Sequence, residues 1–238
     1  MMPRHGKRYT KALETYDSAD THGPTDAIKL VKGNATAKFD ETIELHVRTE
    51  LDPRHADQQV RGTVKLPHGL GKEVRVAVFA EGDTARVASE AGAIDVGGDD
   101  LIAKIEKGYT DFDVALAQRE LMGKVGKLGR VLGPRGLMPN PRAGTVVNAD
   151  EMGKAVSEAQ QGRVEFRLDR LALMHVPIGK ASFEEDKLLE NLSALVQEIV
   201  KAKPAGSKGI YIRGIHLTST MGPSVAMDLQ PTLNLKTE

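Results

Sequence analysis

The chain has 238 residues, of which 40% are hydrophobic, a proportion that supports a real core and excludes a disordered protein. Cysteine is absent, which excludes disulfides, thiolate metal sites and thiol nucleophiles. The 33 basic and 33 acidic residues cancel, so any binding to nucleic acid must come from local patches rather than from the charge of the whole molecule.

The first part of the chain has α+β character. Helices are expected around Thr10–Asp17 and Asp26–Gly33. Residues 39–48, FDETIELHVR, alternate between apolar and polar side chains, which predicts a strand with one buried and one solvent-facing side. The buried side would hold Phe39, Ile43, Leu45 and Val47, with Glu41 as an exception. The other side would hold Thr42, Glu44 and His46, the last as an ordinary surface histidine. GTVKLP at 62–67 predicts a second short strand.

The pattern changes after residue 69. VRVAVF at 74–79 is a continuous apolar strand of the kind found in parallel sheets. Further segments then alternate between helix and strand: helix 83–91, strand 94–96, helix 99–107, strand 112–116 and a later helix over 150–161. This rhythm predicts a three-layer α/β domain.

The alternating β pattern returns after Gly162, with strands expected at 164–168, 172–176 and 210–220. Between them, Ser182 and Glu185 have the spacing of a capping box at the start of a long amphipathic helix. The order of these patterns predicts two domains. One would be discontinuous, built from 1–68 and 162–238, and the other would be inserted over 69–161. The inserted part holds 12 basic and 14 acidic residues, so neither domain is broadly basic.

The run from Leu121 to Ala149 contains no acidic residue but five Lys or Arg, six Gly and three Pro. Gly and Pro oppose regular structure, so we expect a positively charged loop system. Two interpretations are open at this point: turns with solvated cations, or an anion-binding loop. Its candidate contacts are Lys124, Lys127, Arg130 and Arg135.

The sequence lacks several common enzyme motifs. Gly71-Lys72 lacks both the earlier Gly and the following Ser or Thr of a phosphate-binding loop, and no GxGxxG follows the first strand of the middle domain. Asp99-Asp100 is best explained as a helix cap. We expect no catalytic residue, no metal site and no cofactor. The alternative, a nucleotide-binding enzyme module in the inserted domain, rests on the βαβ rhythm and the basic glycine run.

The segment TSTMGPS at 218–224 combines hydroxyls, a glycine and a flexible Met at a strand end. Such groups suit ribose hydroxyls and phosphates, although a plain strand-to-turn exit would look the same. Longer motifs add to it, namely KFDETIE at 38–44, VRGTVKLPHGLGK at 60–72, KLGRVLGPRGLMPNPRAG at 127–144 and TMGPSV at 220–225. Together they resemble the bacterial large-subunit ribosomal protein L-one family, the proteins of the mobile stalk beside the exit site. The resemblance covers nearly the whole chain and departs mainly at LDRLALMH, 168–175.

This resemblance implies a split α+β domain with an inserted Rossmann-like domain, in agreement with the patterns above. It implies a non-enzymatic protein that binds large-subunit rRNA, forms the stalk, helps deacylated tRNA to leave the exit site and represses its own operon messenger. The protein would be cytoplasmic, ribosome-associated, monomeric off the ribosome and not membrane-bound. The main RNA contacts carry over to Lys38, Phe39, Thr42, Glu44, Thr220, Met221 and Gly222. Glu165 and Arg167 are further candidates on a neighbouring strand.

Overall fold

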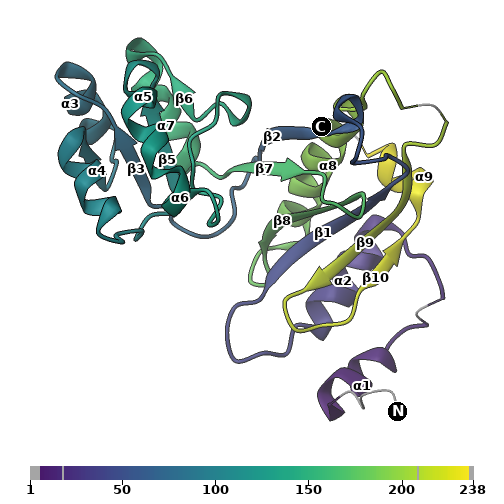
Figure 1. Cartoon of the computed structure of the whole chain (residues 1–238). Coiled ribbons are helices and arrows are strands. Elements are labelled where there is room, and N and C mark those ends of the chain that lie inside the picture. The colour runs from purple at the N-terminus through teal and green to yellow at the C-terminus, as the bar shows by residue number, and fades with distance from the viewer. Residues whose placement is uncertain (1–5, 18, 208, 236–238) are drawn as a thin grey trace. The chain divides into compact units, whose positions relative to one another are not determined.

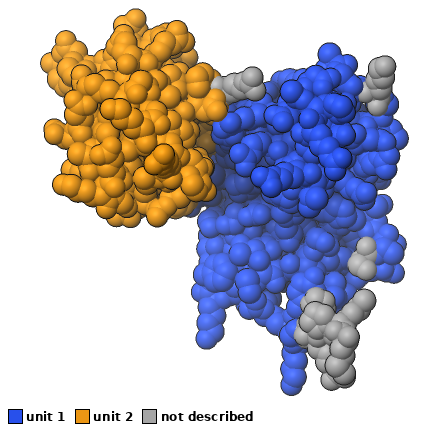
Figure 2. Space-filling model, in the orientation of Figure 1, with its two compact units in different colours: residues 1–71, 164–238 blue, residues 72–163 orange. Residues whose placement is uncertain are grey.

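A computed structural model describes residues 6–17, 19–207 and 209–235 of the chain. The chain forms two compact units (Figure 2). Unit 1 contains residues 1–71 and 164–238, and unit 2 contains residues 72–163. Unit 1 is therefore assembled from both ends of the sequence, and the chain passes between the units twice. Among the described residues, no helix has the length and apolar character needed to cross a bilayer.

Unit 1 is built on a four-stranded antiparallel sheet in the order β10-β9-β1-β8 (Figure 1). The strands are β1 (Thr42–Thr49), β8 (Leu173–Lys180), β9 (Ile212–Ser219) and β10 (Val225–Met227). In β1 every second side chain is buried, as the alternation predicted. A separate two-stranded sheet joins β2 (Arg61–Lys65) to β7 (Arg163–Arg167).

Helices α2 (Pro24–Asn34) and α8 (Glu185–Lys201) cover one face of the four-stranded sheet (Figure 1). The predicted stripe of α8 is buried at Leu188, Leu192, Leu195, Val196 and Ile199. The predicted capping box is wrong, because α8 begins at Glu185 without a side-chain cap. Ser182 instead bonds to the carboxylate of Asp40, with its hydroxyl at 2.7 Å and its backbone N–H at 3.1 Å. Short helices α1 (Lys7–Leu13) and α9 (Leu229–Leu233) complete the unit.

Unit 2 is the expected three-layer α/β structure. Its parallel sheet has the order β4-β3-β5-β6. The strands are β3 (Val76–Phe79), β4 (Asp95–Gly97), β5 (Val114–Gln118) and β6 (Val146–Val147). Helices α3 (Asp83–Glu90) and α7 (Met152–Gln160) pack on one face, and α4 (Asp99–Glu106) packs on the other. Both faces of the sheet are covered, which explains why β3 is apolar throughout.

The glycine-rich run is more regular than the loop system that its composition suggested. From Arg119 to Leu132, 3-10 turns alternate with the short helices α5 (Met122–Val125) and α6 (Gly129–Leu132). The sequence repeats as Gly-Lys-Val, Gly-Lys-Leu and Gly-Arg-Val from residue 123. A repeat of three suits 3-10 geometry and brings one apolar side chain per triplet to one side. Val125 and Leu128 are fully buried there, and after the third triplet Leu132 takes the buried position beside half-buried Val131. The burial of these side chains offsets the helix-opposing effect of glycine.

Candidate nucleic-acid interface

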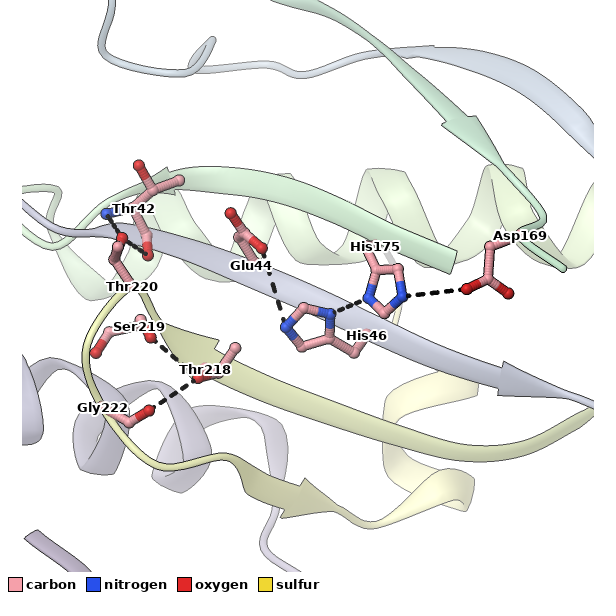
Figure 3. Close-up of polar contacts among 9 residues, drawn as sticks. All are labelled: Thr42, Glu44, His46, Asp169, His175, Thr218, Ser219, Thr220 and Gly222. Carbon is pink, nitrogen blue, oxygen red and sulfur yellow. Dashed lines mark hydrogen bonds and ion pairs between the residues drawn. The ribbon is translucent and has the colours of Figure 1, made fainter. Parts of the chain in front are cut away.

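Two segments far apart in sequence meet at one end of the four-stranded sheet, where β1 begins and β9 ends (Figure 3). The backbone N–H of Thr42 donates to the hydroxyl of Thr220 at 3.0 Å. The same hydroxyl donates to the carbonyl of Thr42 at 3.3 Å. Thr220 thus continues the β1–β9 pairing through its side chain, and two of the predicted contact residues are fixed beside each other.

Glu41 anchors the turn that follows β9. Its carboxylate is 1% exposed and accepts hydrogen bonds from the backbone N–H of Ala37 at 2.8 Å and of Met221 at 2.9 Å. Burial would raise the pKa of Glu41, but the two backbone N–H groups outweigh it and hold the pKa below its usual value. A charged, buried carboxylate therefore holds the backbone at this end of the sheet. The sequence pattern identified Glu41 only as a polar exception on the apolar side of the strand.

The bond from Ala37 to Glu41 also turns the chain before β1 starts. Phe39 therefore does not occupy the buried position that the alternation predicted, and its side chain is 55% exposed. Met221 is 52% exposed across the same end of the sheet, and Lys38 is exposed beside Phe39. Large apolar side chains that protrude next to a polar surface are suited to packing against a partner.

Gly222 closes a tight turn at the strand exit. Its N–H donates to the carbonyl of Ser219 at 3.3 Å, and the hydroxyl of Thr218 donates to the carbonyls of Ser219 and Gly222 (Figure 3). A Cβ atom at residue 222 would lie 2.5 Å from the Ser219 hydroxyl oxygen. A side chain at residue 222 would therefore force the Ser219 hydroxyl to rotate, whereas exposed Met221 and half-buried Gly222 leave the backbone of the turn open to close approach.

A β-bulge adds a cation that the sequence pattern did not reveal. The pairing of β1 with β8 shifts between Ile43 and Glu44, so that Glu44 lies opposite Pro177 and Thr42 opposite Lys180. The ammonium of Lys180 donates to the hydroxyl of Thr42 at 2.8 Å. Without the bulge, strict alternation along β8 would place Lys180 on the other face. Thr42 and Glu44 share the solvent-facing side of β1, as expected.

The weaker candidates Glu165 and Arg167 are not part of this cluster. Both are exposed on β7, which pairs with β2 in the two-stranded sheet rather than with β1 or β9. Glu165 forms an ion pair with Arg61, with 2.5 Å between its carboxylate and the guanidinium Nε. The expected neighbouring strand is therefore a strand of a different sheet.

The four candidate cations of the glycine-rich run divide into two kinds. Lys124 is paired with Asp99 at 2.9 Å and Glu81 at 3.3 Å, and Arg135 donates to the hydroxyl of Thr110. Lys127 and Arg130 are exposed, and in the described part of the chain neither has a carboxylate within ion-pair distance. The number of cations available to an anion is therefore smaller than the sequence count suggests.

His46 is not the ordinary surface histidine that the sequence suggested. It lies opposite His175 on β8 and opposite His216 on β9, so three histidines form a row across three strands. Nδ1 of His46 is 2.6 Å from Nδ1 of His175. No group of three or more His, Asp or Glu in the described ranges has an arrangement that could hold a metal ion. Strand register, which a single sequence does not supply, creates the row.

The fold and this surface define a class of two-unit proteins, in which a parallel α/β unit is inserted into a split α+β unit with an antiparallel sheet. The profile of the ribosomal protein L1p/L10e family matches residues 31–223. The large ribosomal subunit protein uL1 of Dehalococcoides mccartyi is 53% identical over 229 residues, which cover 96% of this chain and 97% of that protein. The uL1 protein of Chloroflexus aggregans is 53% identical over 236 residues, covering 99% and 100%. The chain belongs to the ribosomal protein L1p/L10e family.

Proposed function

We propose that this protein is a structural component of the large ribosomal subunit that binds rRNA through the end of the unit 1 sheet. The observation that carries the proposal is the rigid surface in which Thr42 and Thr220 are bonded to each other and Glu41 holds the backbone of Met221. Its relatives are named as large ribosomal subunit proteins. A surface fixed before binding loses little entropy when RNA docks on it.

The chemistry of the surface suits folded RNA better than a bare phosphate chain. Hydroxyl groups and exposed backbone at Thr218 and 220–222 can bond ribose 2′-OH groups and phosphate oxygens. Glu44 would be repelled by phosphates, so it would accept a hydrogen bond from a 2′-OH or a base amine. Exposed Phe39 and Met221 would pack on the ribose or base faces. Shape and hydrogen bonding would then contribute more than counterion release.

The remaining roles concern partners beyond rRNA. We propose that unit 1 is the main RNA-binding domain and that Lys127 and Arg130 of unit 2 make a secondary, charge-based contact. We also propose that the protein is a monomer off the ribosome, forms the mobile stalk in the cytoplasm and assists release of exit-site tRNA. A messenger from its own operon that repeats the rRNA structure would compete for the same surface, which would repress translation. The resemblance to the stalk protein family supports these roles.

Binding to a large-subunit rRNA stalk fragment and to an unrelated hairpin of equal length, across a salt series, tests the proposal. The full chain should prefer the rRNA fragment by at least about a thousandfold, the lower range for specific nucleic-acid recognition. Thr220→Ala and Met221→Ala should each weaken rRNA binding by about fivefold or more. Equal affinity for the two RNAs would contradict the function, and unchanged binding by both variants would contradict the site.

A further inference from the structure

The histidine row continues the candidate RNA surface along the open face of the unit 1 sheet. His46 follows Thr42 and Glu44 at alternate positions of β1, so all three side chains lie on the face that α2 and α8 do not cover. Figure 3 shows a line of contacts that runs from Glu44 to His46 on β1, then to His175 on β8 and to Asp169 before that strand. Glu44, an expected RNA contact, is one end of this line.

The contacts along the line are suited to holding an extra proton. The Nδ1 atoms of His46 and His175 face each other at 2.6 Å, so one ring must donate an N–H to the other. The two outer ring nitrogens face carboxylates: Nε2 of His46 is 4.0 Å from Glu44, and Nε2 of His175 is 3.7 Å from Asp169. A pair with one additional proton has an N–H toward each carboxylate and one N–H shared between the rings.

The neutral pair cannot satisfy both ends. It carries only two ring protons, and one of them is used between the rings. One of the two outer nitrogens then presents a lone pair to a carboxylate, which is a repulsive contact. A doubly charged pair is also excluded at this spacing, because two N–H groups would then point at each other. The geometry therefore favours a total charge of zero or one for the pair.

We propose that His46 and His175 act as one proton-sharing unit that positions Glu44 for RNA and makes RNA affinity increase as the pH falls. This inference rests on the proposed function of the sheet end. When the pair takes up its proton, Glu44 gains a cationic neighbour, and its repulsion of RNA phosphates is reduced. His46 and His175 are positioning residues in this scheme, and the rRNA is the partner.

The surroundings set the direction of the effect. Burial and the neighbouring His175 and His216 lower the pKa of His46, and Glu44 opposes them. The other charged groups facing the pair are Asp169, at the turn before β8, and Arg48, two residues further along β1. The free protein is therefore neutral at His46 near pH 7. RNA phosphates close to this face would raise the proton affinity of the pair, so RNA binding would be coupled to proton uptake.

The test is the Kd for the rRNA stalk fragment measured between about pH 6 and pH 8, the range in which histidine titrates. A pKa that rises by one unit on binding changes the Kd by about tenfold, so the wild type should bind about five- to tenfold more tightly at the acidic end. His175→Gln and His46→Gln should each remove most of this dependence. His175 is 48% exposed in its side chain, so its replacement should leave the fold intact.

The matched control is His68→Gln. His68 also faces a carboxylate, with Nε2 2.6 Å from Glu190, but within the described residues its hydrogen bonds and ion pair involve no second histidine. This variant should keep the wild-type pH dependence. The inference would be overturned if the Kd for the rRNA fragment changed with pH to the same extent in the wild type, His46→Gln and His175→Gln.

A second readout separates the pair from a structural role. In NMR titrations of the free protein, the ring resonances of His46 should follow those of His175, and His175→Gln should shift the midpoint of His46. Independent midpoints would overturn the coupling. If the wild type binds both RNAs equally at every pH, the proposed function fails. If it discriminates between them but the profiles are parallel, only this inference fails.

Discussion

The sheet end of unit 1 and the glycine-rich helical run of unit 2 are the two surfaces that we propose to contact RNA, and they are built in different ways. The first contains hydroxyls, exposed backbone and the buried carboxylate of Glu41, and its side chains are bonded to one another. The second presents Lys127 and Arg130 on glycine-rich turns without such bonds in the described residues. A fixed hydrogen-bonding surface can select a shape, whereas exposed cations attract any phosphate chain. Specificity should therefore lie in unit 1 and salt dependence in unit 2.

Glu41→Ala should have the largest effect, because it removes the internal support of the sheet end. The backbone N–H groups of Ala37 and Met221 would lose their acceptor in a partly buried site, which should cost about 1–3 kcal/mol in the free energy of unfolding. rRNA affinity should also fall by about tenfold or more, because the turn at Met221 is no longer held. Urea unfolding and RNA binding measure the two effects.

The exposed glutamate Glu106 on α4 offers the control for this experiment. Glu106→Ala should change stability by less than about 0.5 kcal/mol, as is usual at exposed positions. Equal effects of the two substitutions would show that Glu41 does not support the sheet end.

Two glycines allow a direct comparison of the two regions. Gly222→Ala should weaken rRNA binding by about tenfold, because its Cβ would displace the Ser219 hydroxyl, 2.5 Å away, and would add a methyl group to the surface proposed to meet RNA. Gly126→Ala meets no atom within 4 Å and lies in a helical segment. It should stabilise unit 2 by about 0.5–1 kcal/mol without changing rRNA affinity. A larger loss of affinity from Gly126→Ala than from Gly222→Ala would reverse the assignment of the two regions.

Sequence patterns predicted the regular parts of both units, for clear physical reasons. The alternation from Thr42 to Val47 and the apolar run of β3 depend only on which side of a sheet is wet. The prediction was wrong where tertiary contacts decide the outcome. Phe39 is exposed because Glu41 turns the chain, and the glycine run is helical because its apolar side chains reach the core of unit 2.

Site residues that are brought together by strand pairing could not be predicted from the sequence. Lys180 enters the site through a bulge, and His46 meets His175 and His216 through register. Neither relation is recorded in local sequence, because a shift of one residue in the pairing changes both. The resemblance to a family supplied Thr42 and Thr220 as contacts. Alternation alone placed Thr42 on the solvent-facing side of a strand, and composition left Thr220 in what could be a plain strand exit.

Asp113 supports unit 2 as Glu41 supports unit 1, and its contribution to stability should depend on pH. Burial would raise the pKa of Asp113, but Lys72 and Arg75 outweigh it and hold the pKa at about 2. A lowered pKa stabilises the fold above the unfolded pKa of about 4, and this contribution is lost as the pH falls through about 2. Asp113→Asn should cost about 1 kcal/mol at pH 7, because its partners are partly exposed and screened.

Thermal unfolding followed at pH 7 and again near pH 2 measures this contribution. The loss of thermal stability caused by Asp113→Asn should become smaller at the acidic pH, because the wild-type carboxylate is also partly protonated there. A loss that is the same at both pH values would mean that charge at Asp113 does not stabilise unit 2.

Joint replacement of Lys127 and Arg130 by Ala should have the smallest effect on recognition. The slope of log affinity against log salt should become shallower by about one to two, because up to two phosphate contacts are lost. The preference for the rRNA fragment over the hairpin should remain. Lys104 and Lys107, exposed cations near the end of α4, provide a control of equal charge change. A loss of preference in the Lys127 and Arg130 variant would place recognition in unit 2.

Hydrogen–deuterium exchange of the full chain, with and without the rRNA stalk fragment, tests the division between the two regions most directly. Backbone amides report contact and ordering without any substitution, so the folding of variants does not enter. We predict protection by RNA over residues 38–44 and 218–223, with little change over residues 123–132. Protection confined to residues 123–132, with unchanged exchange at both segments of the sheet end, would contradict this prediction.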